Sequence, residues 1–459
     1  MRMKRIASSF RDPDGYMFDH NGEIYRAVNP SYQPAYDHLL ASGLYQKLVD
    51  RGLMIPFEEV DQSSLGLVGF YKILKPERIR FISYPYEWAL NMLRDAAILT
   101  LEIQQLALEH GMSLKDASAF NVQFQNGKPV FIDTLSFEIY PVDRPWVAYR
   151  QFCQHFLAPL ALMAHVDPGL NRLLIVHIDG IPLDLAAKLL PYRCRFNLGL
   201  YLHIFLHAKS QAKYKSSSIR ISENSRKFSL GSMKALVEGL KSVIEKQQWI
   251  PKGTEWADYT DEGVHTQEYT TFKTKLISKW LDELKPQITW DLGANSGNYS
   301  RLAAQKGSYV LSLDVDPACV KKNYESIRKN KETHILPLLL DLLNPSPSIG
   351  WGGTERLSIY QRNKPDLIMA LAIIHHLAIS ANNPLESIAE LFAGLADDLI
   401  IEFVPKEDEK VQILLLNRED IFPDYTQAKF EEAFSEYYRI EQRIPSDCNQ
   451  RVFYLMRQK

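Results

Sequence analysis

Residues 255–459 are predicted to form an α/β domain, and three observations support this prediction. Short apolar runs alternate with helical segments five times, which is the pattern of strand–helix units that build a parallel sheet. Two glycines, Gly293 and Gly297, follow the first apolar run and permit a tight turn into a helix. Two final strands, 437–442 and 451–456, are joined by a polar turn. We therefore expect a seven-stranded sheet that closes with a hairpin.

The turn after the first strand, residues 288–292, is expected to bind a nucleotide-like ligand. Its sequence is Trp290-Asp291-Leu292-Gly293-Ala294-Asn295-Ser296-Gly297, and a helix over 298–305 follows. The free N–H groups of that helix face whatever lies above the turn. Asn295 stands where a dinucleotide-binding loop has its second glycine, and Asn tolerates left-handed backbone angles better than most residues.

The second strand, residues 309–313, ends in Asp314. This carboxylate follows the glycine turn by about twenty residues, the separation at which an acidic side chain can hold both hydroxyls of a ribose. Asp316 and Pro317 come next, and they suit the cap and first turn of a helix. The spacing between the glycine turn and Asp314 raises the resemblance to a nucleotide-binding loop above a chance match.

The pattern Asp291-x-Gly293-x-Asn295-x-Gly297 followed by Asp314 resembles the first two motifs of the class I S-adenosylmethionine-dependent methyltransferases. The resemblance implies a Rossmann-like domain whose loop wraps the methionine half of S-adenosylmethionine while Asp314 holds the ribose. Asp341, after the apolar run 335–340, resembles the third motif, which lies beside the adenine. A nicotinamide-binding Rossmann unit is the alternative, but Asn295 and Asn298 interrupt its usual Gly-x-Gly-x-x-Gly.

A helix predicted over 267–284 precedes the glycine turn and carries Tyr269 and Lys273 one turn apart on one face. In methyltransferases of this class an upstream helix often closes over the carboxylate of the cofactor. The resemblance therefore makes Tyr269 and Lys273 candidate cofactor contacts, with a surface position as the alternative.

The candidate catalytic residues follow the fourth and fifth strands. His375 and His376 come after the strand 366–372, and Glu402 lies near the end of the strand 399–404. A histidine there can accept a proton from an oxygen or nitrogen nucleophile, because its ordinary pKa lies near neutrality. Packing of both histidines beneath the cofactor is the alternative, and Glu402 is a second candidate for contact with the acceptor. Adjacent histidines lack the spacing of a helical metal site, so no metal is predicted.

An irregular loop, residues 344–356, follows the third strand. Loops at the carboxyl ends of parallel strands build active sites. Trp351, Glu355 and Arg356 are therefore candidates for a wall around the acceptor, and simple loop packing is the alternative.

Residues 1–208 are predicted to form a separate α+β domain. A hairpin turns at Asn21-Gly22, a helix covers 35–52, and strand-like runs cover 68–74 and 79–82. A long helix over 89–110 comes next. A polar linker and a connecting helix fill residues 209–254.

This order of elements, with its Asp-x-x-x-x-Asn loop, resembles the protein-kinase-like fold. The resemblance implies Asp116 as base, Asn121 as metal ligand and Asp133 as magnesium ligand. Kinase residues are missing around Asp116 and Asp133, no glycine-rich phosphate loop precedes residue 30, and Arg26 stands near the position of the phosphate-pairing lysine. The alternatives are that Asp116 and Asn121 only hold a turn, or that the domain binds a substrate or partner without catalysis.

Composition excludes several classes of protein. With 459 residues the chain is long enough for two or three domains. A net charge of −2 gives no strong signal for nucleic acid, and no segment has the roughly 18 uninterrupted apolar residues of a membrane span. The four cysteines lack paired spacing, and the N-terminus has no apolar segment typical of a secretory signal. We therefore expect a cytoplasmic enzyme.

Segments along nearly the whole chain are similar to bacterial nodulation-type host-specificity methyltransferases. Those that carry the similarity are Ile82-Ser83-Tyr84-Pro85-Tyr86-Glu87-Trp88, Lys115-Asp116-Ala117-Ser118, Ile132-Asp133-Thr134-Leu135-Ser136-Phe137-Glu138 and Asn344-Pro345-Ser346-Pro347. We expect transfer of a methyl group from S-adenosylmethionine to an oxygen or nitrogen of a small-molecule or carrier-linked acceptor. A kinase-like phosphotransferase, or a binding role for the N-terminal domain, is the alternative.

Overall fold

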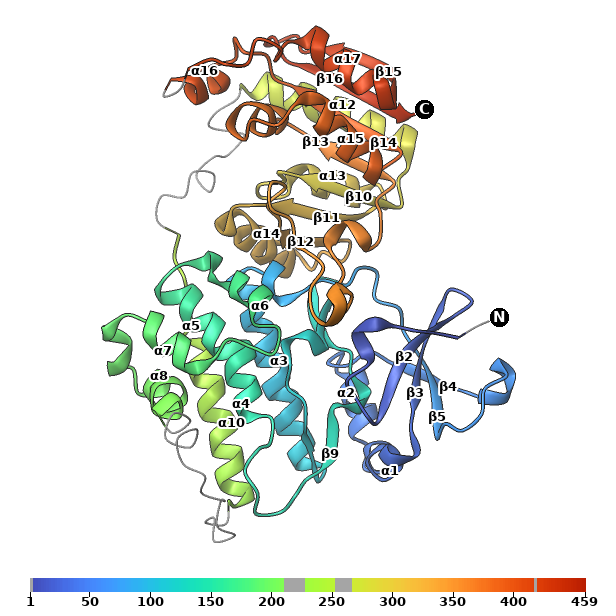
Figure 1. The fold of residues 1–459 in the computed structure, drawn as a ribbon, viewed down its shortest axis with the longest axis vertical. Coiled ribbons are helices and arrows are strands. Elements are labelled where there is room, and N and C mark those ends of the chain that lie inside the picture. The colour runs from blue at the N-terminus through green and yellow to red at the C-terminus, as the bar shows by residue number, and fades with distance from the viewer. Residues whose placement is uncertain (1–2, 210–227, 252–265, 417–418) are drawn as a thin grey trace. The chain divides into compact units, whose positions relative to one another are not determined.

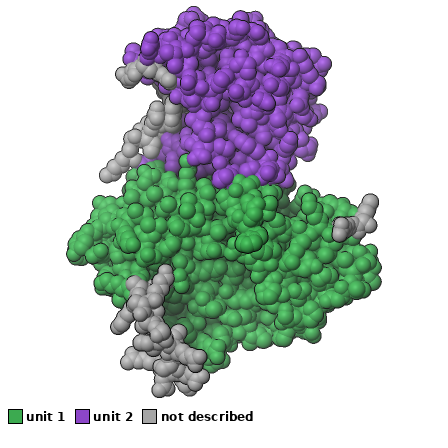
Figure 2. Space-filling view, viewed as in Figure 1, with its two compact units in different colours: residues 1–250, 348–357 green, residues 251–347, 358–459 purple. Residues whose placement is uncertain are grey.

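The computed structural model describes residues 3–209, 228–251, 266–416 and 419–459, and the chain forms two compact units. Unit 1 comprises residues 1–250 and 348–357, and unit 2 comprises 251–347 and 358–459 (Figure 2). Much of the predicted linker 209–254 lies outside the described residues. Its described helix, α10 (Leu230–Glu245), packs against α3 (Leu90–Glu109) within unit 1, where Gln105 Nε2 donates to Glu238 Oε2 at 2.7 Å.

Unit 2 is built on a seven-stranded sheet of order β12-β11-β10-β13-β14-β16-β15 (Figure 1). Its strands are β10 (Ile288–Leu292), β11 (Tyr309–Asp314), β12 (Ile335–Leu339), β13 (Leu367–Ala370), β14 (Asp398–Phe403), β15 (Tyr438–Pro445) and β16 (Val452–Gln458). The first five are parallel, and β16 runs antiparallel to both β14 and β15. The predicted α/β character and the terminal hairpin are confirmed. Strand order reverses between β10 and β13, where ligands bind in open α/β sheets.

Helices cover both faces of this sheet. They are α12 (Gln267–Leu284), α13 (Asn298–Gln305), α14 (Pro317–Asn330), α15 (Leu385–Leu395), α16 (Glu409–Leu415) and α17 (Gln427–Tyr437). The core on one face includes Trp280 of α12, Ala303 of α13 and Ile327 of α14. On the other face, Phe430 of α17 packs with its ring centroid 5.0 Å from that of Phe403 and 5.1 Å from that of Tyr454.

The alternation of side chains along β14 decides which residues reach the candidate site. Ile400 belongs to the core beneath α12, whereas Phe403 packs on α17. Because successive side chains of a strand point to opposite faces, Glu402 lies on the same face as Ile400. Glu402 is therefore placed under α12, which carries Tyr269 and Lys273.

Unit 1 contains a five-stranded antiparallel sheet of order β1-β2-β3-β5-β4. Its strands are β1 (Lys4–Arg5), β2 (Gly15–His20), β3 (Glu23–Val28), β4 (Phe57–Val60) and β5 (Lys72–Pro76). Two further pairs are β6 (Met112–Leu114) with β9 (Phe137–Ile139), and β7 (Val122–Gln125) with β8 (Lys128–Phe131). The predicted hairpin at Asn21-Gly22 is confirmed by the pairing of β2 with β3.

Unit 1 contains further described helices besides α3 and α10. They are α1 (Gln33–Ala41), α2 (Leu44–Asp50), α4 (Tyr149–Phe152), α5 (Ala158–His165), α6 (Leu173–Val176), α7 (Leu183–Leu189) and α8 (Leu198–Leu200), with π-helical turns η7 (Cys153–Leu157) and η10 (Tyr201–Leu206). Of these, α2 and α5 contact α3. No described helix is long and apolar enough to cross a membrane.

Two sequence predictions for unit 1 were wrong. A single helix was expected over 35–52, but Gly43 adopts φ 77° and separates α1 from α2. The segment 79–82 is not a strand, and the edge strand is instead the unpredicted β4. The first error overlooked a local signal, a glycine inside the helical pattern, whereas the second concerns an edge strand that is set by its pairing with β5.

Candidate functional site

The glycine turn lies at the carboxyl end of β10, beside the point where strand order reverses. Gly293, Asn295 and Gly297 all have positive φ, of 70°, 49° and 83°. A Cβ on Gly297 would lie 2.6 Å from Asn323 Nδ2, and one on Gly293 would lie 3.0 Å from Ile373 Cδ1. The turn therefore needs glycine at both positions for conformation and for space, and Asn295 takes the left-handed conformation expected of it.

Asp314 ties this turn to the second strand. Its Oδ2 accepts a hydrogen bond from the backbone N–H of Asn295 at 2.7 Å, and its Oδ1 accepts one from Asp316 at 2.9 Å. Burial raises the pKa of Asp314 to about 6 despite these two bonds. The carboxylate is thus fixed in orientation at the carboxyl edge of the sheet.

Asp291 is buried one strand away and connects β10 to α13. Ser300 Oγ donates to Asp291 Oδ2 at 2.5 Å. Burial raises the pKa of Asp291 to about 7, against the opposing effects of the Ser300 hydroxyl and the Lys273 charge, while Asp314 adds to the rise. Two carboxyl groups with raised pKa values therefore flank the glycine turn, which is typical of functional sites.

Tyr269 and Lys273 of α12 reach Glu402 of β14 beneath the helix. Lys273 Nζ lies 2.9 Å from Glu402 Oε2, and the Tyr269 hydroxyl donates to Glu402 Oε1. Lys273 Nζ also lies 4.6 Å from the ring centroid of Tyr299, in the first turn of α13. The two candidate cofactor residues are therefore buried and oriented, and they do not lie on the surface.

Arg451, in the turn before β16, completes this network. Its Nη1 donates to Glu402 Oε1 at 3.0 Å, and its Nε and Nη2 donate to the two oxygens of Asp408 at 2.7 and 3.2 Å. Asp408 also caps α16 by accepting from the backbone N–H of Lys410 at 3.0 Å. Sequence reasoning missed Arg451 and Asp408, although the capping position of Asp408 before a short helix was a usable signal.

Glu402 is fully buried and ionised. Burial by itself would raise the pKa of Glu402, but the charges of Lys273 and Arg451 and the Tyr269 hydroxyl outweigh that effect and lower it to about 2. Both of its oxygens are engaged by these neighbours. The structure thus groups Glu402 with the candidate cofactor residues, whereas the sequence suggested a place beside the acceptor.

His375 and His376 follow β13, on the other side of the strand-order reversal from the glycine turn. The chain enters them through Ala372, whose φ of 57° is strained for a residue other than glycine. Their ring centroids are 4.1 Å apart. Burial lowers the pKa of His375 well below its usual value, with smaller effects of His376 and Arg451, and burial lowers that of His376 to about 4. Both rings are therefore neutral at pH 7, and His375 Nδ1 has no hydrogen-bond partner within the described residues.

Asp341 lies two residues beyond β12, next to the strand that ends in Asp314. The backbone N–H of Leu340 donates to the carbonyl of Asp314 at 2.9 Å, and Asp341 Oδ1 accepts from Leu343 at 3.0 Å. Asp341 is partly exposed, and its charge adds to the effect of burial in raising the pKa of Tyr360. The position of Asp341 at the next strand end suits contact with the far part of a ligand held by Asp314.

The loop candidates Trp351, Glu355 and Arg356 fall in the segment assigned to unit 1. Arg11 Nη2 donates to Glu355 Oε2 at 2.9 Å, and the guanidinium of Arg356 lies 4.5 Å from the ring centroid of Phe120. These contacts favour loop packing for Glu355 and Arg356. The side chain of Trp351 is exposed.

The residues suggested by the kinase resemblance lie together in unit 1. Arg26 Nη2 is 2.7 Å from Asp133 Oδ1, and Ser136 links Asn121 to Asp133 by accepting from Asn121 Nδ2 at 3.1 Å and donating to Asp133. Asp116 Oδ1 accepts from the backbone N–H of Ser118 at 2.9 Å and from Gln151 Nε2 at 2.8 Å. Burial, followed by the charge of Asp133, raises the pKa of Asp116. These interactions are those of a cross-linked turn.

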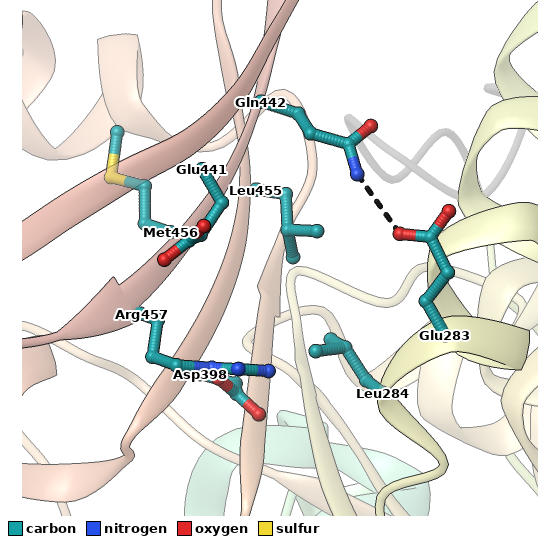
Figure 3. Close-up of a pocket in the computed structure, with 8 residues that line it drawn as sticks. All are labelled: Glu283, Leu284, Asp398, Glu441, Gln442, Leu455, Met456 and Arg457. Atoms are coloured by element: carbon teal, nitrogen blue, oxygen red, sulfur yellow. Dashed lines mark hydrogen bonds and ion pairs between the residues drawn. The ribbon is translucent and has the colours of Figure 1, made fainter.

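A small cavity in unit 2 lies elsewhere (Figure 3). Its volume is about 160 Å³, and its lining includes Leu284, the last residue of α12, and Asp398, the first residue of β14. It therefore lies at the amino ends of the parallel strands, opposite the glycine turn. A cavity of this size is also smaller than typical cofactor sites, which span about 300–1,000 Å³.

Within the part of the chain that the structure describes, no group of three or more His, Cys, Asp or Glu residues is arranged to hold a metal ion. The cysteines are all free: Cys153, Cys194 and Cys319 are buried and Cys448 is exposed.

Comparison with known proteins identifies a relative along the whole chain. No protein-family model matches. The chain is 33% identical to nodulation protein NoeA of Rhizobium meliloti (strain 1021) over 466 residues, which cover 99% of this chain and 96% of that protein.

Solved structures with weaker similarity include two methyltransferases. Magnesium protoporphyrin IX methyltransferase (ChlM) from Synechocystis PCC 6803 with bound SAH is 16% identical, with a TM-score of 0.31, over 44% of this chain and 91% of that one. N-methyltransferase NodS from Bradyrhizobium japonicum WM9 is 11% identical, with a TM-score of 0.32, over 43% of this chain and 99% of that one. Both comparisons cover less than half of this chain.

Proposed function

The chain belongs to the family of nodulation protein NoeA, and from this premise we propose that it is an S-adenosylmethionine-dependent methyltransferase acting on an oxygen or nitrogen nucleophile. The observation that carries the proposal is the glycine turn at the strand-order reversal, fixed to the carboxylate of Asp314 by the Asn295 N–H at 2.7 Å. A ligand with a ribose and a charged chain suits this combination of a close-approach turn and an oriented carboxylate.

The residues around the turn fit such a cofactor. A Cβ on Gly293 or Gly297 would crowd the side chains of Ile373 or Asn323, so these two glycines let the turn pack closely at the carboxyl end of β10. Asp314 would accept hydrogen bonds from the ribose hydroxyls, and Asp341 lies at the next strand end for the base. Tyr269 and Lys273 would face the amino-acid part, where the Lys273 ammonium attracts a carboxylate.

When bound, S-adenosylmethionine supplies a methyl group on a sulfonium, which is already a good leaving group. The protein's contribution is to orient the acceptor and to take its proton. His375 and His376 are the candidates, because they follow β13 at the carboxyl edge of the sheet and because His375 Nδ1 has no hydrogen-bond partner within the described residues. We assign Glu402 the separate role of orienting Lys273 and Tyr269, since its oxygens are engaged by those residues and Arg451.

For unit 1 we favour a role in binding the acceptor or a partner over phosphotransfer. Arg26 pairs directly with Asp133, the residue that would have to hold magnesium in a kinase. Asp116, the base by the kinase resemblance, is hydrogen-bonded by Ser118 and Gln151. The acceptor itself is a small molecule or a carrier-linked group in this proposal.

Calorimetric titration of the full chain with S-adenosylmethionine tests the proposal. We expect saturable binding by the unchanged chain and a loss of at least about 30-fold in affinity in Asp314→Ala, because two or more charge-assisted hydrogen bonds are removed. Asp282→Ala is the matched control, since Asp282 lies on α12 but is exposed and pairs with Lys306. This variant should bind S-adenosylmethionine as the unchanged chain does.

A parallel titration with magnesium-ATP separates the alternative. Binding of ATP that Asp133→Ala abolishes, together with no binding of S-adenosylmethionine, would overturn the proposal in favour of a kinase-like phosphotransferase. Binding of S-adenosylmethionine that survives Asp314→Ala would place the cofactor away from the glycine turn.

A further inference from the structure

Unit 1 carries an exposed apolar surface that the proposed methyltransferase site does not use. We call it the Phe196 surface, and it comprises Leu189, Tyr192, Phe196, Leu198, Leu202 and Leu206. Phe196 is 80% exposed, Leu198 71% and Tyr192 70%. Single exposed apolar residues are ordinary, but several large ones on adjoining elements mark an interaction surface.

The Phe196 surface is formed by connected helical elements. Leu189 ends α7, a 3-10 turn covers Tyr192–Phe196, and α8 continues into η10, which contacts both α7 and that turn (Figure 1). The Tyr192 and Phe196 ring centroids are 5.7 Å apart. Leu198, Leu202 and Leu206 recur every four residues, which places them on one side of the helical segment.

The opposite side of that segment is anchored in the core of unit 1. His203 and Ile204 of η10 are buried, and His203 Nδ1 lies 2.8 Å from the Tyr149 hydroxyl. The Phe196 surface is therefore presented by a fixed element. The buried side of η10 already packs in unit 1, which leaves Leu202 and Leu206 on its exposed side.

The charges on this segment are all positive. Residues 185–208 contain no Asp or Glu and include Lys188, Arg193 and Arg195, all of them exposed. Asp184 precedes them on α7 and lies 4.0 Å from Lys188 Nζ, so the positive charge that is not paired within α7 comes from Arg193 and Arg195. The guanidinium of Arg195 lies 5.1 Å from the ring centroid of Tyr192 and 5.5 Å from that of Phe205. Long basic side chains that lie along aromatic rings can hold their charges at a polar boundary while the rings enter an apolar phase.

We propose that the Phe196 surface docks unit 1 on an anionic lipid bilayer. Leucine and aromatic side chains with flanking arginine are the combination that interfacial helices use to insert into the headgroup boundary. An acidic lipid surface complements the positive charges of Arg193 and Arg195, and each such charge strengthens binding. Insertion of exposed side chains into the headgroup boundary is a peripheral and reversible attachment.

Sedimentation of the full chain with lipid vesicles tests this inference. The vesicles are phosphatidylcholine alone or with about one-third phosphatidylglycerol. We expect binding to the anionic vesicles that weakens as salt is added, and little binding to the neutral ones. Phe196→Ser with Leu198→Ser should lower the partition coefficient at least about tenfold, because two large side chains no longer enter the boundary. Arg193→Gln with Arg195→Gln should lower it by about tenfold on anionic vesicles only.

Val68→Ser is the matched control, because Val68 is 85% exposed in the same unit but outside the Phe196 surface, and it should bind vesicles normally. Circular dichroism should give the same melting temperature for all variants, since every changed side chain is exposed. The proposal fails if the full chain leaves anionic vesicles unbound, or if the Phe196 and Leu198 changes have no more effect than Val68→Ser. It also fails if these changes instead disperse a dimer seen by analytical ultracentrifugation, which would assign the surface to a second copy of the chain.

Discussion

Asp291 holds a proton more tightly in the folded chain than an exposed aspartate does. Burial raises its pKa to about 7, whereas the unfolded chain has a value of about 3.9. Between these values the folded state carries a proton that the unfolded state has released, so the free energy of unfolding falls as the pH rises from about 4 to about 7 and is level above that. This cost is the physical price of placing a carboxylate beneath the glycine turn.

We therefore predict that the free energy of unfolding of the unchanged chain falls with rising pH relative to that of Asp291→Asn, which has no carboxyl group to titrate at this position. The difference in free energy of unfolding should grow by about 3 kcal/mol between pH 5 and pH 8, roughly the value of a two-unit shift. Asparagine keeps an acceptor for the Ser300 hydroxyl, so its fold should survive. Urea unfolding at several pH values measures this, and parallel pH profiles for the two proteins would contradict a raised pKa at Asp291.

The two histidines predict an unusual pH dependence of turnover. If either imidazole takes the acceptor's proton, titration of that imidazole should lower kcat only as the pH approaches about 4, because burial lowers the pKa of His376 to that value and of His375 well below normal. The pKa values of Asp314 and Asp291 are raised to about 6 and about 7, so kcat is measured at saturating S-adenosylmethionine to separate their effect on cofactor binding. Replacing the responsible histidine by glutamine should lower kcat by about 10²–10⁴-fold without weakening cofactor binding. A fall in kcat centred near pH 6.5 that is also present in Asp291→Asn, with S-adenosylmethionine saturating, would exclude both histidines.

At the scale of elements, the Glu402 network joins α12, β14 and the turn before β16. It gathers two cations, Lys273 and Arg451, around one fully buried carboxylate. Removing one member of a buried ion network costs far more than removing an exposed pair, because the remaining charges keep their desolvation penalty without a partner. The network therefore holds α12 at a defined distance from the sheet.

We predict that Glu402→Gln lowers the free energy of unfolding by about 3–5 kcal/mol and weakens binding of S-adenosylmethionine, since Lys273 loses its orientation. Asp398→Asn, at the other end of β14, is the control; its exposed pair with Arg457 should contribute less than about 1 kcal/mol. Urea unfolding measures both. Equal losses in the two variants would mean that the buried network does not position α12.

The elements of unit 2 were largely predictable because their signals are local. The apolar run 288–292, the glycines after it and the cap at Asp316 each specify a strand, a turn or a helix start within a few residues, and β10, α13 and α14 begin where these signals place them. In unit 1 the break at Gly43 also had a local signal, a glycine inside the helical pattern, but the prediction of one helix passed over it. The edge strand β4 had no such signal, because its boundaries depend on pairing with β5.

In the candidate site, too, local signals predicted some residues, and contacts between residues distant in sequence hid others. The residues at strand ends, such as Asp314, were found from spacing, because parallel strands bring their carboxyl ends to one edge. Arg451 was not found, because its partners Glu402 and Asp408 are 49 and 43 residues away and no periodic pattern connects them. The engagement of Glu402 with Lys273 depends on which face of β14 lies under α12, which only the assembled sheet determines.

At the scale of the whole molecule, the residues proposed to hold the cofactor all lie in unit 2, while unit 1 is proposed to bind the acceptor or a partner. A fragment of residues 251–459 should then bind S-adenosylmethionine with an affinity within about threefold of the full chain, because no proposed contact is lost. Its turnover on the native acceptor should fall by about tenfold or more, since positioning of the acceptor is lost.

The segment 348–357 complicates this comparison, because in the fragment it lacks Arg11 and Phe120, the unit 1 partners of Glu355 and Arg356. Glu355→Gln in the full chain is the matched control, since it weakens the same contact with Arg11 while unit 1 remains. If Glu355→Gln alone lowers turnover as far as truncation does, the loss belongs to the segment. If the fragment turns over the native acceptor as fast as the full chain, unit 1 does not deliver it. A fragment that binds cofactor and a control that keeps turnover would together locate acceptor binding in unit 1.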